Sequence, residues 1–270
     1  MSAPVQSPPT SRLRAEGVTL RYDQRVVSTG LSVDIPSNEF TVIIGPNACG
    51  KSTLLRSLSR LLRPAEGQVT LDGNPLPSFR PKDFARTVGL LPQSSIAPEG
   101  ITVVDLVSRG RFPYQKLVRQ WTDADEQAVR TAMAATNVAE LANREVAELS
   151  GGQRQRVWAA MAIAQQTPIL LLDEPTTFLD LTHQIEMLDL FARLHRAGTT
   201  VVAVLHDLNQ AARYATHLIV MKSGTLIASG PPAEVLTEHL VREVFELNCM
   251  VIEDPASGTP LIIPTDGQWH

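Results

Sequence analysis

A glycine-rich segment in the first quarter of the chain has the residue types and spacing of a phosphate-binding loop. Residues 45–53, with the sequence GPNACGKST, satisfy the pattern G-x4-G-K-[ST] between a short β-rich run and a helical pattern that begins at Ser52. Glycines let backbone N–H groups wrap around phosphates, and the following helix presents its positive end to them. We therefore expect Lys51 to reach the terminal phosphates of ATP and the Ser52 hydroxyl to coordinate Mg²⁺.

The whole segment is expected to surround the same phosphates. The residues expected to contact the nucleotide are Gly45, Pro46, Asn47, Ala48, Cys49, Gly50, Lys51, Ser52 and Thr53. The alternative for the segment is a glycine turn that caps an ordinary helix. Within it, Cys49 is interpreted as a small residue that fits beside phosphate, and a redox switch is the alternative.

Two acidic residues and a histidine follow apolar runs that are typical of buried strands. Residues 169–172 (ILLL) lead into Asp173 and Glu174, and residues 201–205 (VVAVL) lead into His206. Ligands of α/β sheets bind at the carboxyl ends of the strands, so these side chains should lie at that edge. Asp173 is expected to hold Mg²⁺, directly or through water, Glu174 to accept a proton from attacking water, and His206 to contact the γ-phosphate. The alternatives are a helix-capping acidic pair and a structural histidine.

A second glycine motif, LSGGQ at residues 149–153, precedes a helical pattern over residues 154–166. Ser150 is a good N-cap and the glycines expose N–H groups, so the motif predicts a second anion-binding helix start. One nucleotide does not obviously need two such cradles from one chain. Two chains arranged head to tail would use both.

The strand and helix patterns around these motifs predict an α/β fold. Residues 13–22 and 26–35 alternate as two antiparallel strands joined by a turn at Asp23 and Gln24. From residue 169 onward strand and helix patterns alternate, which implies a mostly parallel sheet with helices on both faces. Residues 94–167 lack strand signals and read as a mostly helical insertion. Further strands are expected at residues 40–44, 67–73, 88–91, 169–172, 200–205 and 218–221, with a late hairpin at 222–225, and helices at 52–62, 123–139, 154–166, 183–195, 208–214 and from Pro232.

Length, charge and cysteine content narrow the class of protein. The chain has 270 residues and a net charge of −4, which gives no argument for nucleic acid as a partner. Its two cysteines, Cys49 and Cys249, make no disulfide framework and indicate a reducing cytoplasm. No signal peptide is evident, and no apolar run approaches the ~20 residues needed to cross a bilayer. We expect a disordered lead-in at residues 1–11, an ATPase domain at 12–252 and a tail at 253–270.

The order and spacing of these motifs resemble those of ATP-binding cassette (ABC) ATPases, over about residues 12–238. The segments that carry the resemblance are residues 45–53, Gln93, residues 149–153, residues 169–174, Asp180 and His206. The pairing of LSGGQ with a phosphate-binding loop is highly specific. The resemblance implies a phosphate-loop NTPase core, an N-terminal antiparallel β subdomain, a helical insertion subdomain, and ATP with Mg²⁺ as ligands.

The resemblance also implies a role for each matched residue. Tyr22 matches the aromatic residue that stacks on adenine, and Gln93 the glutamine that contacts Mg²⁺ or water and links the helical subdomain to the core. Glu174 matches the general base, and His206 the histidine that holds the γ-phosphate. The residues matched to the interface between two subunits are Ser150, Gly151 and Gly152, which contact the γ-phosphate held by the partner, with Gln153 in the same motif, and Asp180, which signals across the interface.

Two local features resemble the importers of iron–siderophore complexes, haem or vitamin B12. They are residues 175–184 (PTTFLDLTHQ) and residues 107–114 (VSRGRFPY). In the second, exposed Phe, Tyr and Arg side chains over residues 109–114 would anchor a membrane subunit, and an ordinary exposed loop is the alternative.

The resemblance implies an ATPase held at the cytoplasmic face of the cell membrane. Its expected partners are a second ATPase subunit, identical or paired, an integral membrane permease and, indirectly, a substrate-binding protein. Iron–siderophore uptake is the favoured function. The alternatives are haem, cobalamin or another metal chelate as cargo, and a soluble ABC ATPase such as an iron–sulphur assembly scaffold.

Overall fold

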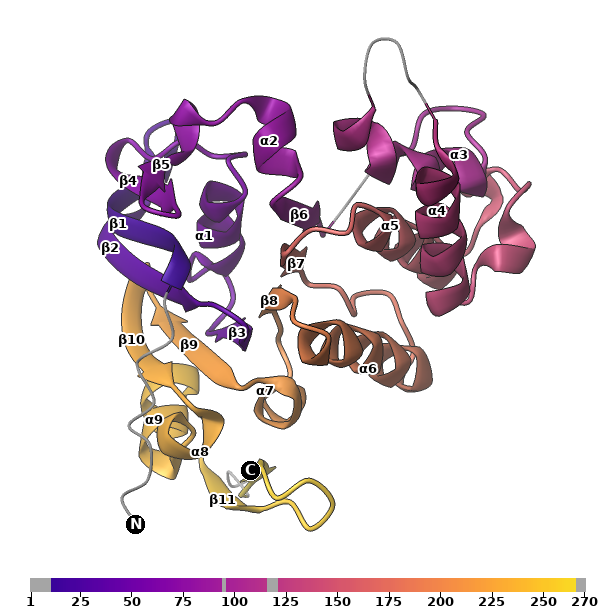
Figure 1. Cartoon of the computed structure of the whole chain (residues 1–270). Coiled ribbons are helices and arrows are strands. Elements are labelled where there is room, and N and C mark those ends of the chain that lie inside the picture. Colours follow the sequence, from indigo (N-terminus) through magenta and orange to yellow (C-terminus); the bar gives the residue numbers. More distant parts are fainter. Residues whose placement is uncertain (1–10, 94–95, 116–120, 266–270) are drawn as a thin grey trace, which may run out of the picture.

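The computed structural model of the chain describes residues 11–93, 96–115 and 121–265. The expected lead-in therefore lies outside the described residues, except for Ser11, which begins the first strand. Figure 1 shows an antiparallel sheet at the upper left, a mostly parallel sheet in the centre and a helical insertion at the upper right. These are the three parts that the sequence predicts.

The central sheet has six strands in the order β10-β9-β3-β8-β7-β6. The five neighbouring strands β9, β3, β8, β7 and β6 run parallel to one another. Strand β10 forms an antiparallel hairpin with β9 at the edge of the sheet. Every residue of β3, β7 and β8 is buried, as expected for strands covered by helices on both faces. The strands are β3 (Phe40–Ile44), β6 (Val88–Leu91), β7 (Ile169–Asp173), β8 (Thr200–Val204), β9 (His217–Lys222) and β10 (Thr225–Gly230).

The antiparallel sheet has the order β2-β1-β4-β5. Its strands are β1 (Ser11–Tyr22), β2 (Arg25–Pro36), β4 (Glu66–Leu71) and β5 (Asn74–Pro75). The predicted turn between β1 and β2 is confirmed, with Asp23 in the left-handed conformation at φ 48°. Helix α1 (Lys51–Leu58) lies between the two sheets, because Leu54 and Leu58 pack in one core with residues of β1, β3, β7 and β8. It ends four residues before the predicted Leu62, and Arg60 turns the chain with φ 66°.

The other face of the central sheet is covered by α6, α7 and the C-terminal elements. Phe40 of β3 and Phe191 of α6 are fully buried in this second core. The C-terminal strands β11 and β12 pair as a hairpin, and Ile262 of β12 is buried in the same core. The expected end of the ATPase domain, residue 252, falls inside β11, and the packed core continues past it to Ile262. The elements are α6 (Leu181–Arg196), α7 (Leu208–Tyr214), α8 (Pro232–Val235), α9 (Glu238–Phe245), β11 (Cys249–Glu253) and β12 (Pro260–Pro264).

The helical insertion has a hydrophobic core of its own, to which Leu106, Val129 and Val157 belong. Its main helices are α3 (Val103–Ser108), α4 (Asp123–Ala135) and α5 (Gly151–Ala164); α3 was not predicted. The short helices of the chain are α2 (Pro81–Ala85), η1 (Leu76–Ser78), η2 (Arg109–Tyr114), η3 (Ala139–Leu141) and η4 (Val146–Glu148). In the part of the chain that the structure describes, no helix is long and apolar enough to span a membrane.

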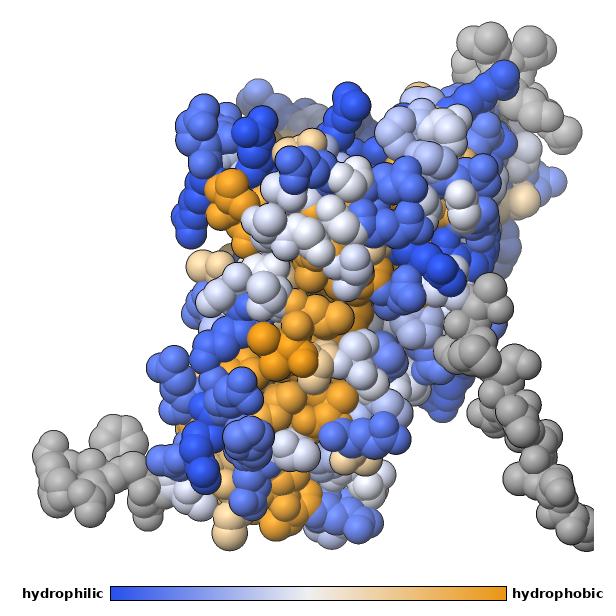
Figure 2. All heavy atoms as spheres, turned by 90° about the vertical axis from the view of Figure 1, so that its left-hand side faces the viewer, coloured by the Kyte–Doolittle hydropathy of each residue, from blue (hydrophilic) through white to orange (hydrophobic). Residues whose placement is uncertain are grey.

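The edge strands β2 and β10 meet on one side of the molecule. The turn between β9 and β10 presses against β2, since a Cβ at Gly224 would lie 1.9 Å from the Val27 carbonyl oxygen. Figure 2 shows apolar surface gathered in the middle of this face. Exposed apolar side chains on the two edge strands are Val26, Leu226 and Ile227. The two sheets thus share a partly apolar outer seam.

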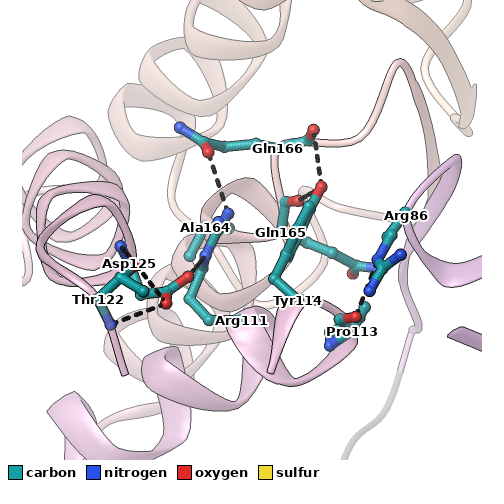
Figure 3. Close-up of polar contacts among 9 residues, drawn as sticks. All are labelled: Arg86, Arg111, Pro113, Tyr114, Thr122, Asp125, Ala164, Gln165 and Gln166. Atoms are coloured by element: carbon teal, nitrogen blue, oxygen red, sulfur yellow. Dashed lines mark hydrogen bonds and ion pairs between the residues drawn. The ribbon is translucent and has the colours of Figure 1, made fainter. Parts of the chain in front are cut away.

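The expectation that residues 109–114 expose a set of anchoring side chains is wrong for Arg111 and Tyr114. Arg111 is only 5 % exposed and donates from Nε to Asp125 Oδ1 at 2.8 Å and from Nη1 to the Ala164 carbonyl at 2.8 Å (Figure 3). Its guanidinium carbon lies 4.0 Å from the centre of the Tyr114 ring. These contacts fasten η2 to α4 and α5. Among the Arg, Phe and Tyr residues that suggested an anchor, only Arg109 and Phe112 are exposed.

The ion pair between Arg111 and Asp125 is buried on both sides, with 6 % of each side chain exposed. Burial alone would raise the pKa of Asp125, but hydrogen bonds from Thr122 and Arg111 outweigh it and hold the pKa below its usual value. Removing one partner of such a pair leaves an uncompensated charge in the interior, which costs far more than losing a surface pair.

We expect Arg111→Met to lower the free energy of unfolding by about 3–5 kcal/mol, because Asp125 would stay buried without its cation. Urea unfolding followed by circular dichroism measures the change as a lower midpoint at an unchanged slope. Arg109→Met, the same substitution at an exposed position two residues earlier, is the control and should stay within about 0.5 kcal/mol of the parent. Equal losses in the two variants would contradict a structural role for the buried pair.

Candidate functional site

The loop between β3 and α1 needs glycine where it leaves the sheet. Gly45 has φ 153°, and a Cβ there would lie 2.1 Å from the Met221 carbonyl oxygen on β9. Gly50 has φ 106° immediately before α1. Side chains at these positions would be strained or would clash, so the loop can close tightly only with glycine. The predicted strand–loop–helix context of the phosphate loop is confirmed.

The side chain of Lys51 lies inside this loop. Lys51 is 5 % exposed and its Nζ donates to the carbonyl oxygens of Gly45 and Pro46, both at 2.9 Å. Neither acceptor carries a formal charge, so these contacts orient the ammonium without neutralising it. A positive group held in this way suits a phosphate oxygen.

Ser52 and Asp173 face one another across the start of α1 and the end of β7. The Ser52 hydroxyl donates to Asp173 Oδ1 at 2.7 Å, and Asp173 is 2 % exposed. Burial raises the pKa of Asp173, and the hydrogen bond from Ser52 opposes this shift. Among the described residues, no group of three or more His, Cys, Asp and Glu side chains could hold a metal alone. Two oxygen groups from the chain fit Mg²⁺, which takes few protein ligands and completes its shell with water and phosphate.

Glu174 lies where the residues that follow β6, β7 and β8 meet. Its carboxylate accepts from Gln93 Nε2 at 2.6 Å on Oε2 and lies 2.7 Å from His206 Nε2 through Oε1. Thr177 Oγ1 also donates to Oε2, at 3.3 Å. Glu174 adopts the left-handed conformation, with φ 53°, directly after β7. The turn lets neighbouring Asp173 and Glu174 serve different contacts, Asp173 toward α1 and Glu174 toward Gln93 and His206.

A cavity of about 260 Å³ joins the phosphate loop to these residues. Its lining residues are Tyr22, Arg25, Val27, Asn47, Ala48, Cys49, Gly50, Lys51, Ser52, Thr53, Glu174 and His206. Tyr22 is 39 % exposed, and its hydroxyl accepts from Arg56 Nη1 at 3.1 Å. Gly45, Pro46, Gln93 and Asp173 touch this site through the hydrogen bonds described above.

Sequence reasoning missed Arg25 and Val27 as lining residues. Both follow the β1–β2 turn, and Arg25 pairs with Tyr22 across the two strands. No motif marks them, and the only signal available was that a hairpin partner of Tyr22 must lie beside it.

The second glycine motif does not line this cavity. Ser150 and Gln153 form a capping box at the start of α5: Ser150 Oγ accepts from the Gln153 backbone N–H at 3.2 Å, and Gln153 Oε1 accepts from the Ser150 N–H at 3.1 Å. Gly151 is exposed, and Gly152 lies close to Leu179, whose Cδ2 would be 3.2 Å from an added Cβ. The motif thus lies at the surface, beside the loop that follows Glu174.

Asp180 caps α6 rather than the nucleotide cavity. Its Oδ1 accepts from the backbone N–H of His183 at 3.0 Å and lies 2.7 Å from His183 Nδ1. The hydrogen bonds from His183, the backbone one first, lower the pKa of Asp180. Phe178, two residues earlier, is 74 % exposed. The predicted site residues therefore fall into two groups, one around the cavity and one on a separate surface that contains residues 150–153 and 180.

Cys49 is buried within the phosphate loop, at 4 % exposed. Burial raises the pKa of its thiol. A buried thiol with a raised pKa carries little thiolate and is poorly placed for oxidation. This environment favours the interpretation as a small packing residue over a redox switch.

Comparison with known proteins agrees with this geometry. A protein-family model described as "ABC transporter" matches residues 28–177. The ferric enterobactin transport ATP-binding protein FepC of Escherichia coli (strain K12) is 53 % identical over 255 residues, covering 94 % of each chain. The petrobactin import ATP-binding protein FpuD of Bacillus anthracis is 50 % identical over 253 residues, covering 93 % of each chain.

Solved structures give the same answer for the fold. The dimeric structure of MJ0796, a bacterial ABC transporter cassette, superposes with a TM-score of 0.73 at 27 % identity, over 81 % of this chain and 98 % of that one. A phosphate loop, a carboxylate edge and a separate LSGGQ helix start thus occur here on the fold of such cassettes. The chain belongs to the ABC transporter family and is one of its ATP-hydrolysing cassettes.

Proposed function

We propose that this cassette binds MgATP in the cavity at the phosphate loop and hydrolyses it with Glu174 as the general base. The observation that carries the proposal is the position of the Glu174 carboxylate, which lines the same cavity as Lys51 and is held by Gln93 and His206. A general base must lie within hydrogen-bond reach of the water that it deprotonates. The groups around Glu174 leave its carboxylate at the cavity wall, where such a water would lie.

The chain's own residues divide the work of phosphoryl transfer. Lys51 and the loop N–H groups bind and orient the phosphates, Tyr22 offers a ring for the adenine, and Gln93 and His206 orient Glu174. Ser52, Asp173 and Gln93 would hold Mg²⁺, which when bound neutralises charge on the phosphates. His206 lines the same cavity as Glu174, so it can also contact the terminal phosphate.

We further infer that two copies, or this chain and a paired ATPase subunit, act head to tail. Ser150 and Gly151 are exposed and Gly152 and Gln153 are half-buried, and none of the four lines the chain's own cavity, although their helix start suits an anion. A nucleotide bound to one chain would be contacted by Ser150, Gly151, Gly152 and Gln153 of the other, with Asp180 near the junction. The similar cassette MJ0796 is described as dimeric, which supports this arrangement.

The transported cargo is proposed to be an iron–siderophore complex. Two relatives of 50 % identity or more are named for ferric enterobactin transport and petrobactin import. The cassette would sit at the cytoplasmic face of the membrane, held by an integral permease that receives cargo from a substrate-binding protein. Haem, cobalamin or another metal chelate remains the alternative cargo, because the permease and binding protein select it. The names of both relatives favour this function over a soluble scaffold.

Glu174→Gln should lower kcat on the order of 10²–10⁴-fold, because a neutral amide cannot accept the proton of attacking water. The amide keeps the shape of the side chain, so ATP affinity should stay within about threefold of the parent, less than 1 kcal/mol. Steady-state phosphate release and binding of a fluorescent ATP analogue measure the two quantities. Hydrolysis at the parental rate would remove Glu174 from the role of base.

Asp173→Asn should raise the Mg²⁺ concentration needed for half-maximal hydrolysis by about 10-fold or more, because a neutral amide attracts the cation less than a carboxylate does. Titrating ATPase activity with MgCl₂ measures the change, and added EDTA should abolish activity in the parent. Asp123→Asn, on the exposed start of α4, is the matched control. An unchanged Mg²⁺ dependence would exclude Asp173 as a metal ligand.

Cells that lack this chain should lose uptake of ⁵⁵Fe-labelled ferric siderophore, and the parental chain should restore it while Glu174→Gln should not. The reason is that transport against a gradient needs ATP turnover, which the variant cannot supply. Uptake of labelled haem and cobalamin in the same cells is the control for cargo. Loss of haem or cobalamin uptake with normal siderophore uptake would overturn the proposed cargo and leave the ATPase assignment intact.

A further inference from the structure

Two glutamine side chains connect the loop that carries Glu174 with the helix that follows His206. Gln210 Nε2, on α7, donates to Gln184 Oε1, on α6, at 2.9 Å. Gln184 Nε2 then donates to the carbonyl oxygen of Leu179 at 3.0 Å. Both glutamines line a cavity of about 250 Å³ together with Glu174 and His206. The pair therefore borders the same cavity as the side chains proposed to carry out hydrolysis.

The loop over residues 174–180 depends on contacts of this kind for its position. Its internal hydrogen bonds are few and long. The Thr177 N–H donates to the Glu174 carbonyl at 3.2 Å, the Leu179 N–H to the Thr176 carbonyl at 3.3 Å, and Thr177 Oγ1 to Glu174 Oε2 at 3.3 Å. On one side Gln155 of α5 donates to the Pro175 carbonyl at 3.2 Å. The bond from Gln184 to Leu179 holds the other end of the loop.

Helix α7, which carries Gln210, is held in place by further hydrogen bonds. Asp207 Oδ1 caps α7 by accepting from the Gln210 backbone N–H at 2.8 Å. Asn209 makes two hydrogen bonds to the backbone of Ile262 in β12: its Nδ2 donates to the carbonyl at 3.2 Å and its Oδ1 accepts from the N–H at 2.7 Å. Gln210 is thus presented from a helix that is capped at its N-terminus and hydrogen-bonded to β12.

We propose that Gln184, supported by Gln210, is a positioning residue that holds the residue 174–180 loop so that Glu174 stays in reach of both His206 and the cavity. This inference rests on the proposed role of Glu174 as the base. An amide side chain can accept one hydrogen bond and donate another at the same time, whereas an ionised carboxylate can only accept. Gln184 uses both capacities, accepting from Gln210 and donating to Leu179.

The test is Gln184→Glu, which preserves size and the contact with Gln210 but cannot donate to the Leu179 carbonyl. With the purified full-length chain and MgATP, we expect kcat to fall on the order of 10-fold, as a displaced base would cause. The ATP concentration for half-maximal rate should stay within about twofold of the parent, because the phosphate loop is untouched. Gln127→Glu, the same change on the exposed face of α4, is the control and should match the parent.

Gln210→Met tests the second link, because it removes the donor to Gln184 at similar side-chain length. If the two glutamines act as one unit, the double variant should lose no more activity than the more affected single variant. Thermal unfolding of each variant checks that the fold is kept, and if Gln184→Glu does not fold, Gln210→Met alone decides. For Gln210→Met as well, kcat must fall while the ATP concentration for half-maximal rate stays at the parental value.

Three results would overturn the inference: a parental kcat in Gln184→Glu, a change confined to the ATP concentration for half-maximal rate, or a loss in the double variant that equals the sum of the two single losses. Glu174→Gln, assayed in parallel, separates this outcome from failure of the proposed function. If Glu174→Gln is inactive and Gln184→Glu is parental, only the positioning role fails. If Glu174→Gln is fully active, the assignment of the base itself is wrong.

Discussion

The close approach of the phosphate loop to the carbonyl of Met221 is the constraint on which the site depends. Only a residue without Cβ can occupy position 45, since that atom would lie 2.1 Å from the Met221 oxygen. The contact exists because β3 pairs with β9 on one side and with β8 on the other, so the loop leaves the sheet between two neighbours. The Gly224 N–H, just beyond β9, donates to the Cys49 carbonyl at 3.0 Å and holds the far side of the loop. The sheet therefore fixes the shape of this loop, and a loop that is already ordered would bind phosphate at a lower cost in conformational entropy.

Much of the fold could be predicted because its central strands are buried on both faces. Such strands are continuous apolar runs in the sequence, and residues 40–44, 169–172 and 200–205 were recognised in this way. The polar residues that follow these runs were predictable for the same reason, since parallel strands end at one edge. Helix α3 could not be predicted, because its six residues are too few for a helical period to distinguish it from a loop.

The environment of residues 109–114 could not be predicted, and the reason is distance along the chain. Arg111 finds its partners 14 residues away in Asp125 and 53 residues away in Ala164, on helices whose arrangement local sequence does not determine. A segment rich in Arg, Phe and Tyr can serve a binding surface or a buried cation–π cluster equally well. Only the packing of α4 and α5 decides between them, and here it selects burial for Arg111 and exposure for Phe112.

The buried cluster around Arg111 also bears on how the insertion is joined to the end of the sheet that carries Glu174. Just before β6, Arg86 donates to the Pro113 carbonyl at 2.9 Å, with its guanidinium 5.7 Å from the Tyr114 ring centre. Just after β6, Gln93 donates to Glu174. This edge strand, which pairs only with β7 in the described sheet, is thus tied to the insertion at one end and to Glu174 at the other. Energetic coupling between distant parts of a protein needs such contiguous contacts. The insertion is therefore joined to the loop that carries Glu174 by two routes, one through β6 and one through Gln155 of α5, which donates to the Pro175 carbonyl.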